Sequence, residues 1–217
     1  MLTTIILNNE EPKVVEYTYE LLWRELKDIE NADLIISDNW FDDLEGIKNK
    51  FVCFVEADCL VNSGYFQSQV GLLQKNKYFR KLAMLASGVG VNAWHNKFYG
   101  YRLRIEKDEM VQPEKLKHSN TVYPIQIGFV PGAIIRKKML VDAMDTLKLS
   151  MGTGSDLLLL SAMLSLEFWG QGDGNRVHIN PNTTYVTTDT TVNDLGHFDD
   201  VFKVSKKVKD IFVKESI

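Results

Sequence analysis

Residues 51–58 of this chain read Phe-Val-Cys-Phe-Val-Glu-Ala-Asp, in which five apolar residues run directly into a segment with two carboxylates. The apolar run is typical of a strand that is buried on both faces. Side chains two positions apart on a strand point the same way, so Glu56 and Asp58 share one side of its carboxyl end if strand geometry persists. Open α/β sheets bind ligands at that edge, and paired carboxylates favour Mg²⁺, Mn²⁺ or Ca²⁺. The same spacing also fits a solvated polar turn.

Length and composition restrict the class of protein. The chain has 217 residues, 45% of them hydrophobic and 25% charged, which favours one ordinary α/β domain. A net charge of −4 argues against a general nucleic-acid-binding surface. The two cysteines, Cys53 and Cys59, suggest neither a structural disulfide nor a zinc site. Because no apolar run is long enough to span a membrane and the first residues lack signal-peptide features, we expect a cytoplasmic protein.

Strand and helix patterns alternate over the first 90 residues. Short apolar runs that end in turn residues predict strands, and apolar residues at helical spacing predict helices. The predicted strands cover residues 3–7, 33–37, 51–55 and 82–87, the predicted helices cover residues 12–27 and about 62–75, and residues 41–49 form one or two helical turns. This alternation favours a parallel sheet with helices on its faces.

The second half of the chain has a less regular pattern. Aromatic and arginine residues without clear periodicity predict hairpins or long loops over residues 91–125. We then expect a strand pair at 125–135 around Gly128 and Gly132, a helix at 136–147, a glycine-rich loop at 151–156, a buried helix at 157–168 and a strand at 177–179. Residues 198–215 predict an amphipathic helix that packs on the body or on another subunit.

Four segments in this order together resemble the GT-A-type glycosyltransferases grouped in glycosyltransferase family 2. They are Thr-Ile-Ile-Leu-Asn-Asn at 4–9, Phe-Val-Glu-Ala-Asp-Cys-Leu-Val-Asn-Ser-Gly-Tyr-Phe at 54–66, Gly-Phe-Val-Pro-Gly-Ala-Ile-Ile-Arg-Lys-Lys-Met-Leu at 128–140 and Gly-Ser-Asp-Leu-Leu-Leu-Leu at 154–160. The resemblance covers residues 3–180 and implies a GT-A-like (Rossmann-like) α/β fold. That fold has a mostly parallel central sheet, flanking helices and a small acceptor-side hairpin region.

The resemblance also implies how a single domain over residues 1–217 is divided. Residues 1–90 form the half that binds the nucleotide sugar, residues 91–180 form the acceptor half, and residues 181–217 form a tail with the amphipathic helix. The implied activity is metal-dependent transfer of a sugar, with inversion, from a nucleotide-sugar donor to an acceptor hydroxyl. A UDP-sugar is the first choice of donor, and a glycan is the default acceptor.

The resemblance assigns roles to individual residues of this sequence. The donor-binding residues are Leu7, Asn8, Asn9, Asp38, Glu56, Ala57 and Asp58. Mn²⁺ or Mg²⁺ is held by Glu56 and Asp58, with His178 as a third ligand. The acceptor-binding residues are Trp94, Gly132 and Ser155. Asp156 is the catalytic base, which removes the proton of the acceptor hydroxyl.

Each of these residues also has a purely structural interpretation. Ser155 or Asp156 suits a helix N-cap, and Asn8 and Asp38 suit turns. A single histidine such as His178 is usually structural, and an aromatic residue such as Trp94 often fills a core.

The sequence departs from the family pattern at two places. Glu56 stands for the usual first Asp of the acidic motif, and Ser155 stands for the usual Glu before Asp156. These changes leave open a degenerate GT-A-fold binding or assembly module without turnover.

Other enzyme classes fit the sequence less well. A sugar-phosphate nucleotidyltransferase ranks lower because the loop after the first predicted strand holds no glycine. The glycine motifs of P-loop ATPases and of dinucleotide dehydrogenases are absent from the sequence. A nucleic-acid acceptor is possible but disfavoured by the net negative charge.

Overall fold

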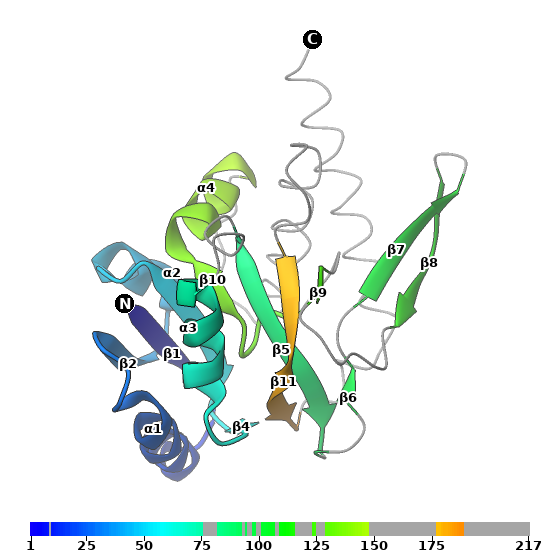
Figure 1. Cartoon of the computed structure of the whole chain (residues 1–217). Coiled ribbons are helices and arrows are strands. Elements are labelled where there is room, and N and C mark those ends of the chain that lie inside the picture. Colours follow the sequence, from blue (N-terminus) through cyan, green and yellow to red (C-terminus); the bar gives the residue numbers. More distant parts are fainter. Residues whose placement is uncertain are drawn as a thin grey trace.

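The computed structural model describes residues 1–8, 10–75, 82–92, 94, 97–98, 101–106, 109–115, 123–124, 129–147 and 177–188. Strands and helices alternate in its first half, and most of the strands of its second half follow one another directly (Figure 1). The elements are β1 (Leu2–Leu7), α1 (Pro12–Leu26), β2 (Ala32–Ser37), α2 (Trp40–Gly46), β3 (Phe51–Glu56), β4 (Leu60–Val61), α3 (Tyr65–Lys75), β5 (Met84–Val91), β6 (Lys97–Phe98), β7 (Tyr101–Glu106), β8 (Glu109–Lys115), β9 (Tyr123–Pro124), β10 (Ile134–Arg136), α4 (Lys137–Leu147) and β11 (Val177–Thr187).

The main sheet has the strand order β2-β1-β3-β10-β5-β11-β4, and β6 and β9 pair with β5 and β11 beside this path. β1 runs parallel to β2 and to β3, and β5 runs parallel to β11. β10 runs antiparallel to both of its neighbours, β3 and β5. The strands β1, β2, β3, β5 and β11 therefore share one direction, and their carboxyl ends meet at one edge, here called the carboxyl edge.

The described sheet is mixed, which corrects the expectation of a mostly parallel one. β10 lies between β3 and β5, where Ile134 pairs with Cys53 and Arg136 pairs with Phe51. The amino end of β10 therefore lies on the side of the carboxyl edge, and its carboxyl end lies at the opposite edge. The expected α/β architecture with flanking helices is confirmed.

Helices cover both faces of the sheet because alternate strand residues point to opposite sides. Phe51, Cys53 and Val55 of β3 belong to a core with side chains of α1 and α3. Val52 and Phe54 belong to a second core with side chains of α2 and α4. β3 thus lies at the centre of a layered structure, as its uninterrupted apolar sequence predicts.

Two strands are longer than the sequence pattern indicated. β5 continues through Gly88, where the predicted strand ended, and through Gly90, because both glycines pair with β11. β11 continues for eight residues beyond the predicted end at residue 179. Its pairing with β5 shifts register between Asn180 and Thr184, so the Pro181 segment forms an irregularity within the strand.

The region before α4 differs from the expected strand pair at 125–135. Within the described residues 129–136, Ile134–Arg136 is the strand, and residues 129–133 form an irregular turn with a bridge between Pro131 and Phe54. Gly132 has a φ of +77°, which breaks strand geometry at that position. The hairpin predicted within residues 91–125 is confirmed by the antiparallel pair β7–β8.

Two further expectations concern the cysteines and the membrane. Cys53 and Cys59 are both buried and free. Among the described residues, no helix combines the length and the apolar character needed to cross a membrane. The predicted helices at 157–168 and 198–215 and the subunit contact through the tail lie outside the described residues.

Candidate functional site

The carboxyl ends of β1, β2 and β3 bring several predicted donor-binding residues together. Leu7, the last residue of β1, is in register with Ser37 of β2 and with Glu56 of β3. Directly beyond these ends, the Asn8 side-chain amide donates a hydrogen bond of 2.5 Å to the Asp38 carboxylate. The exposed pair Asn8–Asp38 thus lies at the same edge of the sheet as Glu56.

Hydroxyl groups of β11 orient the Glu56 carboxylate. Glu56 Oε2 accepts hydrogen bonds from the Tyr185 hydroxyl at 2.9 Å and from Thr187 Oγ1 at 2.7 Å. The Tyr185 hydroxyl also accepts a bond of 3.0 Å from the Glu56 backbone N–H. Burial raises the pKa of Tyr185 well above its ordinary value, so the hydroxyl stays protonated and acts as a donor at neutral pH.

Asp58 reaches the same end of β11 from a turn. β3 ends at Glu56, and residues 57–58 form a turn closed by a hydrogen bond of 3.2 Å from the Cys59 N–H to the Glu56 carbonyl. The Asp58 carboxylate accepts a hydrogen bond from the Thr188 hydroxyl. Strand geometry therefore does not continue from Glu56 to Asp58, and the two carboxylates instead converge on Thr187, the last residue of β11, and on Thr188 directly after it.

Helix α1 anchors the turn that carries Asp58. The Thr18 hydroxyl of α1 donates a hydrogen bond to the carbonyl of Ala57. Ala57 is fully buried among apolar residues, so the structure gives this predicted donor-binding residue no exposed surface for a ligand. The hydrogen bonds from Thr18 to Ala57 and from Thr188 to Asp58 therefore fix the position of the turn and of the Asp58 carboxylate.

Gly132 lies directly beneath Tyr185. A Cβ atom at this position would lie 2.6 Å from Tyr185 Cδ2 and 2.6 Å from the Tyr65 hydroxyl. The Tyr65 hydroxyl donates a bond of 2.5 Å to the Gly132 carbonyl, and the Gly132 N–H donates a bond of 2.7 Å to Phe54. The buried Gly132 thus allows Tyr185 to reach Glu56, a packing role that the sequence interpretation did not include.

His178 lies far from the two carboxylates that it was predicted to join at a metal. It pairs with Leu85, whereas Thr187, which binds Glu56, pairs with Val91. Six positions of β5 separate these partners, which is roughly 20 Å along a strand. Burial lowers the pKa of His178 to about 4, so its imidazole is neutral at pH 7. The structure does not bring His178 together with Glu56 and Asp58.

Only some of the predicted acceptor-binding and catalytic residues belong to the part of the chain that the structure describes. Trp94 is 39% exposed and follows Asn92, whose N–H donates a bond of 2.9 Å to the Thr187 carbonyl at the carboxyl edge. Asn9, Ser155 and Asp156 lie outside the described residues. Of the predicted acceptor-binding residues that the structure describes, Trp94 is exposed near this edge and Gly132 is buried.

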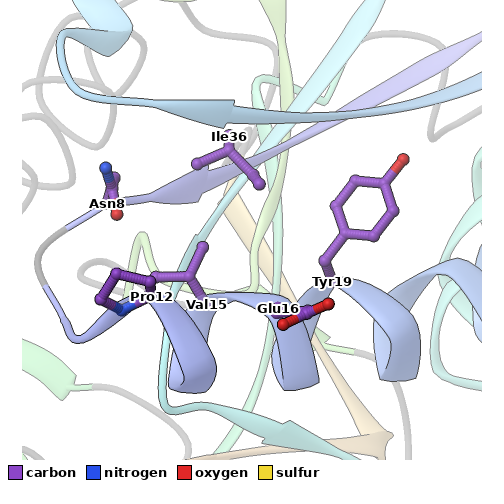
Figure 2. Close-up of a pocket in the computed structure, with 6 residues that line it drawn as sticks. All are labelled: Asn8, Pro12, Val15, Glu16, Tyr19 and Ile36. Atoms are coloured by element: carbon purple, nitrogen blue, oxygen red, sulfur yellow. The ribbon is translucent and has the colours of Figure 1, made fainter.

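A pocket of about 380 Å³ adjoins Asn8 between α1 and β2. In Figure 2, Val15 and Tyr19 project from α1 toward Ile36 of β2, and Asn8 and Pro12 lie at one end. Ile36 is 47% exposed and Val15 is buried, so the pocket has an apolar wall that is open to solvent. A flat, partly apolar group of a ligand bound at the Asn8–Asp38 pair can pack against this apolar wall.

The carboxyl edge supplies only oxygen atoms to a possible cation. Glu56 and Asp58 provide carboxylates, and Thr187 and Thr188 provide hydroxyls beside them. Among the described residues there is no group of three or more His, Cys, Asp or Glu side chains that could hold a metal. This donor set fits Mg²⁺ or Mn²⁺ of the kind that one or two carboxylates bind together with the phosphates of a substrate.

Tyr185, Thr187 and Thr188 are the members of this site that sequence reasoning missed. They belong to the run Thr-Thr-Tyr-Val-Thr-Thr at residues 183–188, whose β-branched and aromatic composition is typical of a strand. Alternation along that strand places Tyr185 and Thr187 on one side of it. The predicted strand ended at residue 179, before this run, so these residues were not assigned to a strand.

Comparison with solved structures identifies the type of fold. The chain resembles TarS of S. aureus, a GT-A-type glycosyltransferase, with a TM-score of 0.52 and 11% sequence identity over 98% of this chain and 42% of TarS. For S. aureus TarS 1–349 the values are 0.53 and 12%, over 95% of this chain and 64% of that one. For TarS 1–349 in complex with UDP-GlcNAc they are 0.51 and 12%, over 87% and 58%. The fold of this chain is GT-A-like.

The likeness rests on structure alone. No family model matches the sequence, and no curated protein matches it either. The chain spans 42% to 64% of the lengths of the structures compared. At these identities the comparison supports the fold, whereas the family and the activity are matters for a proposal.

Proposed function

We propose that this chain is a glycosyltransferase that moves a sugar, with inversion, from a nucleotide-sugar donor to an acceptor hydroxyl. The observation that carries the proposal is the convergence of Asn8–Asp38 and Glu56–Asp58 at the carboxyl edge of a GT-A-like sheet. Open α/β sheets bind their ligands at this edge. TarS 1–349, which has a similar fold, has been crystallised with UDP-GlcNAc, which makes a UDP-sugar the first donor to test.

Within this proposal the nucleoside binds at Asn8 and Asp38. The amide and the carboxylate offer donors and acceptors to a base or a ribose, and the wall formed by Val15, Tyr19 and Ile36 lies next to Asn8. The diphosphate then extends toward the end of β3, because Leu7 and Glu56 are neighbours in the sheet.

The two carboxylates have different surroundings, which suggests a division of labour. Glu56 is held by Tyr185 and Thr187 within the structure, and Asp58 lies on the turn beyond it. In the proposal Asp58 is the main metal ligand, and Glu56 assists directly or through water. When bound there, Mg²⁺ or Mn²⁺ neutralises the negative charge that develops on the departing diphosphate.

The acceptor side rests on fewer described residues. Trp94 offers an exposed ring near the carboxyl edge on which a sugar can stack. Asp156 keeps the role of general base in the proposal, removing the proton of the attacking hydroxyl. A glycan is the default acceptor.

A binding module without turnover is the second candidate. It is favoured by the hydroxyl bonds to both carboxylates, since Tyr185, Thr187 and Thr188 give Glu56 and Asp58 a structural function even without a metal. Such a protein binds a nucleotide sugar, or nothing, and releases no sugar.

The first test is the thermal stability of the chain with nucleoside diphosphates and nucleotide sugars, each with and without Mg²⁺ or Mn²⁺. We expect a rise in Tm that requires both the metal and one nucleoside diphosphate, and that is lost in Asp58→Ala. Asp28→Ala, which removes an exposed carboxylate at the end of α1, is the matched control and keeps the shift. The absence of a shift for every pair would contradict the proposal.

A further inference from the structure

A second pocket, of about 630 Å³, lies at the amino end of β3. Of the seven described residues that line it, four are cationic and one is acidic. They are Asn49, Lys50, Arg136, Lys137, Lys138, Val141 and Asp142. Lys50 directly precedes β3 and Glu56 ends it, six positions later, which is roughly 20 Å along a strand. This pocket is therefore at the opposite edge of the sheet from the proposed donor site.

The contacts of Lys50 and Lys137 with a ring and a carbonyl orient their charges without neutralising them. Lys137 Nζ donates to the carbonyl of Ile47, and Arg136 Nε donates a bond of 3.0 Å to the carbonyl of Leu82. Lys50 Nζ and the Arg136 guanidinium lie 5.7 Å and 5.0 Å from the centroid of the Phe51 ring. Carbonyls and rings fix where these side chains point, but they carry no net charge.

The carboxylate of the pocket is already engaged by one lysine. Asp142 accepts a bond of 2.8 Å from Lys138 Nζ one helical turn away. Lys50, Arg136 and Lys137 line the same pocket. Burial lowers the pKa of the half-buried Arg136.

The position of these cations in the chain is unfavourable by itself. Arg136 directly precedes α4, and Lys137 and Lys138 begin it. The amino end of a helix carries a partial positive charge that favours acidic residues, yet the first turn of α4 contains none. A bound anion would offset both this helix–charge repulsion and the repulsion among the cations.

We propose that this pocket binds a phosphate-bearing ligand. Lysine ammonium groups and an arginine guanidinium are the usual protein partners of phosphate, and the volume suits a small phosphorylated molecule. The phosphate belongs either to a soluble molecule or to the headgroup of an anionic lipid. The site does not depend on the proposed transferase activity.

The test uses pyrophosphate as the soluble probe and vesicles as the lipid probe. Binding of pyrophosphate is measured by calorimetry with EDTA present and at constant ionic strength, so that no metal-dependent binding at the carboxyl edge contributes. Binding to phosphatidylglycerol–phosphatidylcholine vesicles is measured by cosedimentation, with pure phosphatidylcholine vesicles as the uncharged arm.

Variants locate the binding. Lys50→Gln/Lys138→Gln removes two exposed charges of the pocket, and Lys13→Gln/Lys27→Gln removes two exposed charges on and just after α1 as the matched control. Val141→Trp fills the pocket without changing its charge. We expect the dissociation constant for pyrophosphate or for anionic vesicles to rise at least tenfold in the pocket variants. In the control it stays within twofold of the wild-type value.

Either probe alone suffices, and which one binds tells the source of the phosphate. Failure of both probes to bind the wild-type chain would overturn the site. Equal weakening in the pocket and control double variants would also overturn it, because binding would then follow the overall charge. Asp58→Ala keeps wild-type pyrophosphate binding if the pocket is the site.

Discussion

The two edges of the main sheet carry groups of opposite charge. At the carboxyl edge, Glu56, Asp58 and Asp38 converge, and they accept hydrogen bonds from hydroxyls and from one amide. At the amino edge, Lys50 and the cations at the start of α4 surround a pocket whose described lining includes one carboxylate. In the described part of the chain, the two edges thus gather side chains of opposite charge, and we propose a different ligand for each, a cation with a diphosphate at the carboxyl edge and a phosphate at the amino edge.

The largest expected effect comes from breaking the acidic edge. In Asp58→Ala we expect metal-dependent release of sugar from the nucleotide-sugar donor, or its transfer, to fall on the order of 100-fold or more, because charge on the leaving diphosphate is no longer offset. Product formation is followed by chromatography of the nucleotide. Asp28→Ala should keep wild-type turnover, and full activity of Asp58→Ala would remove this residue from the mechanism.

Gly132→Ala tests the packing that holds the acidic edge together. The new methyl group meets Tyr185 and Tyr65 at 2.6 Å, and φ at this position is +77°. We expect the free energy of unfolding to fall by on the order of 3 kcal/mol, measured by urea denaturation. Gly46→Ala, where a Cβ atom meets nothing within 4 Å, is the control and should be neutral or slightly stabilising. A neutral Gly132→Ala would show that Tyr185 is not held in this way.

Tyr185→Phe removes only the hydroxyl that orients Glu56. The Glu56 backbone N–H loses an acceptor and its carboxylate loses a donor, for a cost of about 2 kcal/mol in the free energy of unfolding. If Glu56 contributes to donor binding, the affinity for nucleotide sugar with metal also falls several-fold. Tyr17→Phe on the exposed face of α1 is the control. Unchanged stability and affinity in Tyr185→Phe would show that Glu56 needs no support from β11.

The amino edge gains a charge when His178 is protonated. Its pKa is about 4 in the folded chain, below the ordinary 6.5, because of burial. Between pH 6.5 and pH 4 the unfolded chain binds this proton and the folded one does not, so stability falls as the pH falls through that window. After allowance for solvent screening the loss is about 1.5 kcal/mol. Urea denaturation from pH 7 to 4 should show a shallower decline in His178→Gln than in the wild type, and identical slopes would refute the assignment.

The sequence predicted the first half of the fold well because its signals are local. The apolar run 51–55, the turn at Asp38 and Asn39 and the helical spacing of Val15, Leu22 and Leu26 all correspond to observed elements. The carboxyl ends of β1, β2 and β3 meet at one edge because strands that alternate with helices along the chain pair in parallel. The carboxylates Glu56 and Asp58 were therefore placed at the correct edge.

The rest depended on contacts between segments far apart in the chain. The predicted strands ended at residues 87 and 179, yet pairing between β5 and β11 carries both strands past these positions. The role of Gly132 required Tyr185, which lies 53 positions later and was not assigned to a strand. The basic pocket joins Lys50 to Arg136 through β3 and β10, a neighbour relation that no local pattern expresses.

The most direct test of the donor site is to map UDP on the backbone amides by NMR in the presence of Mg²⁺. We expect the amides of Asn8, Asp38 and Asp58 to shift, whether or not those of Lys50 and Lys138 at the amino edge also shift. Shifts confined to the amino edge, or no shifts at saturating UDP, would contradict the assignment of the carboxyl edge as the nucleotide-sugar site.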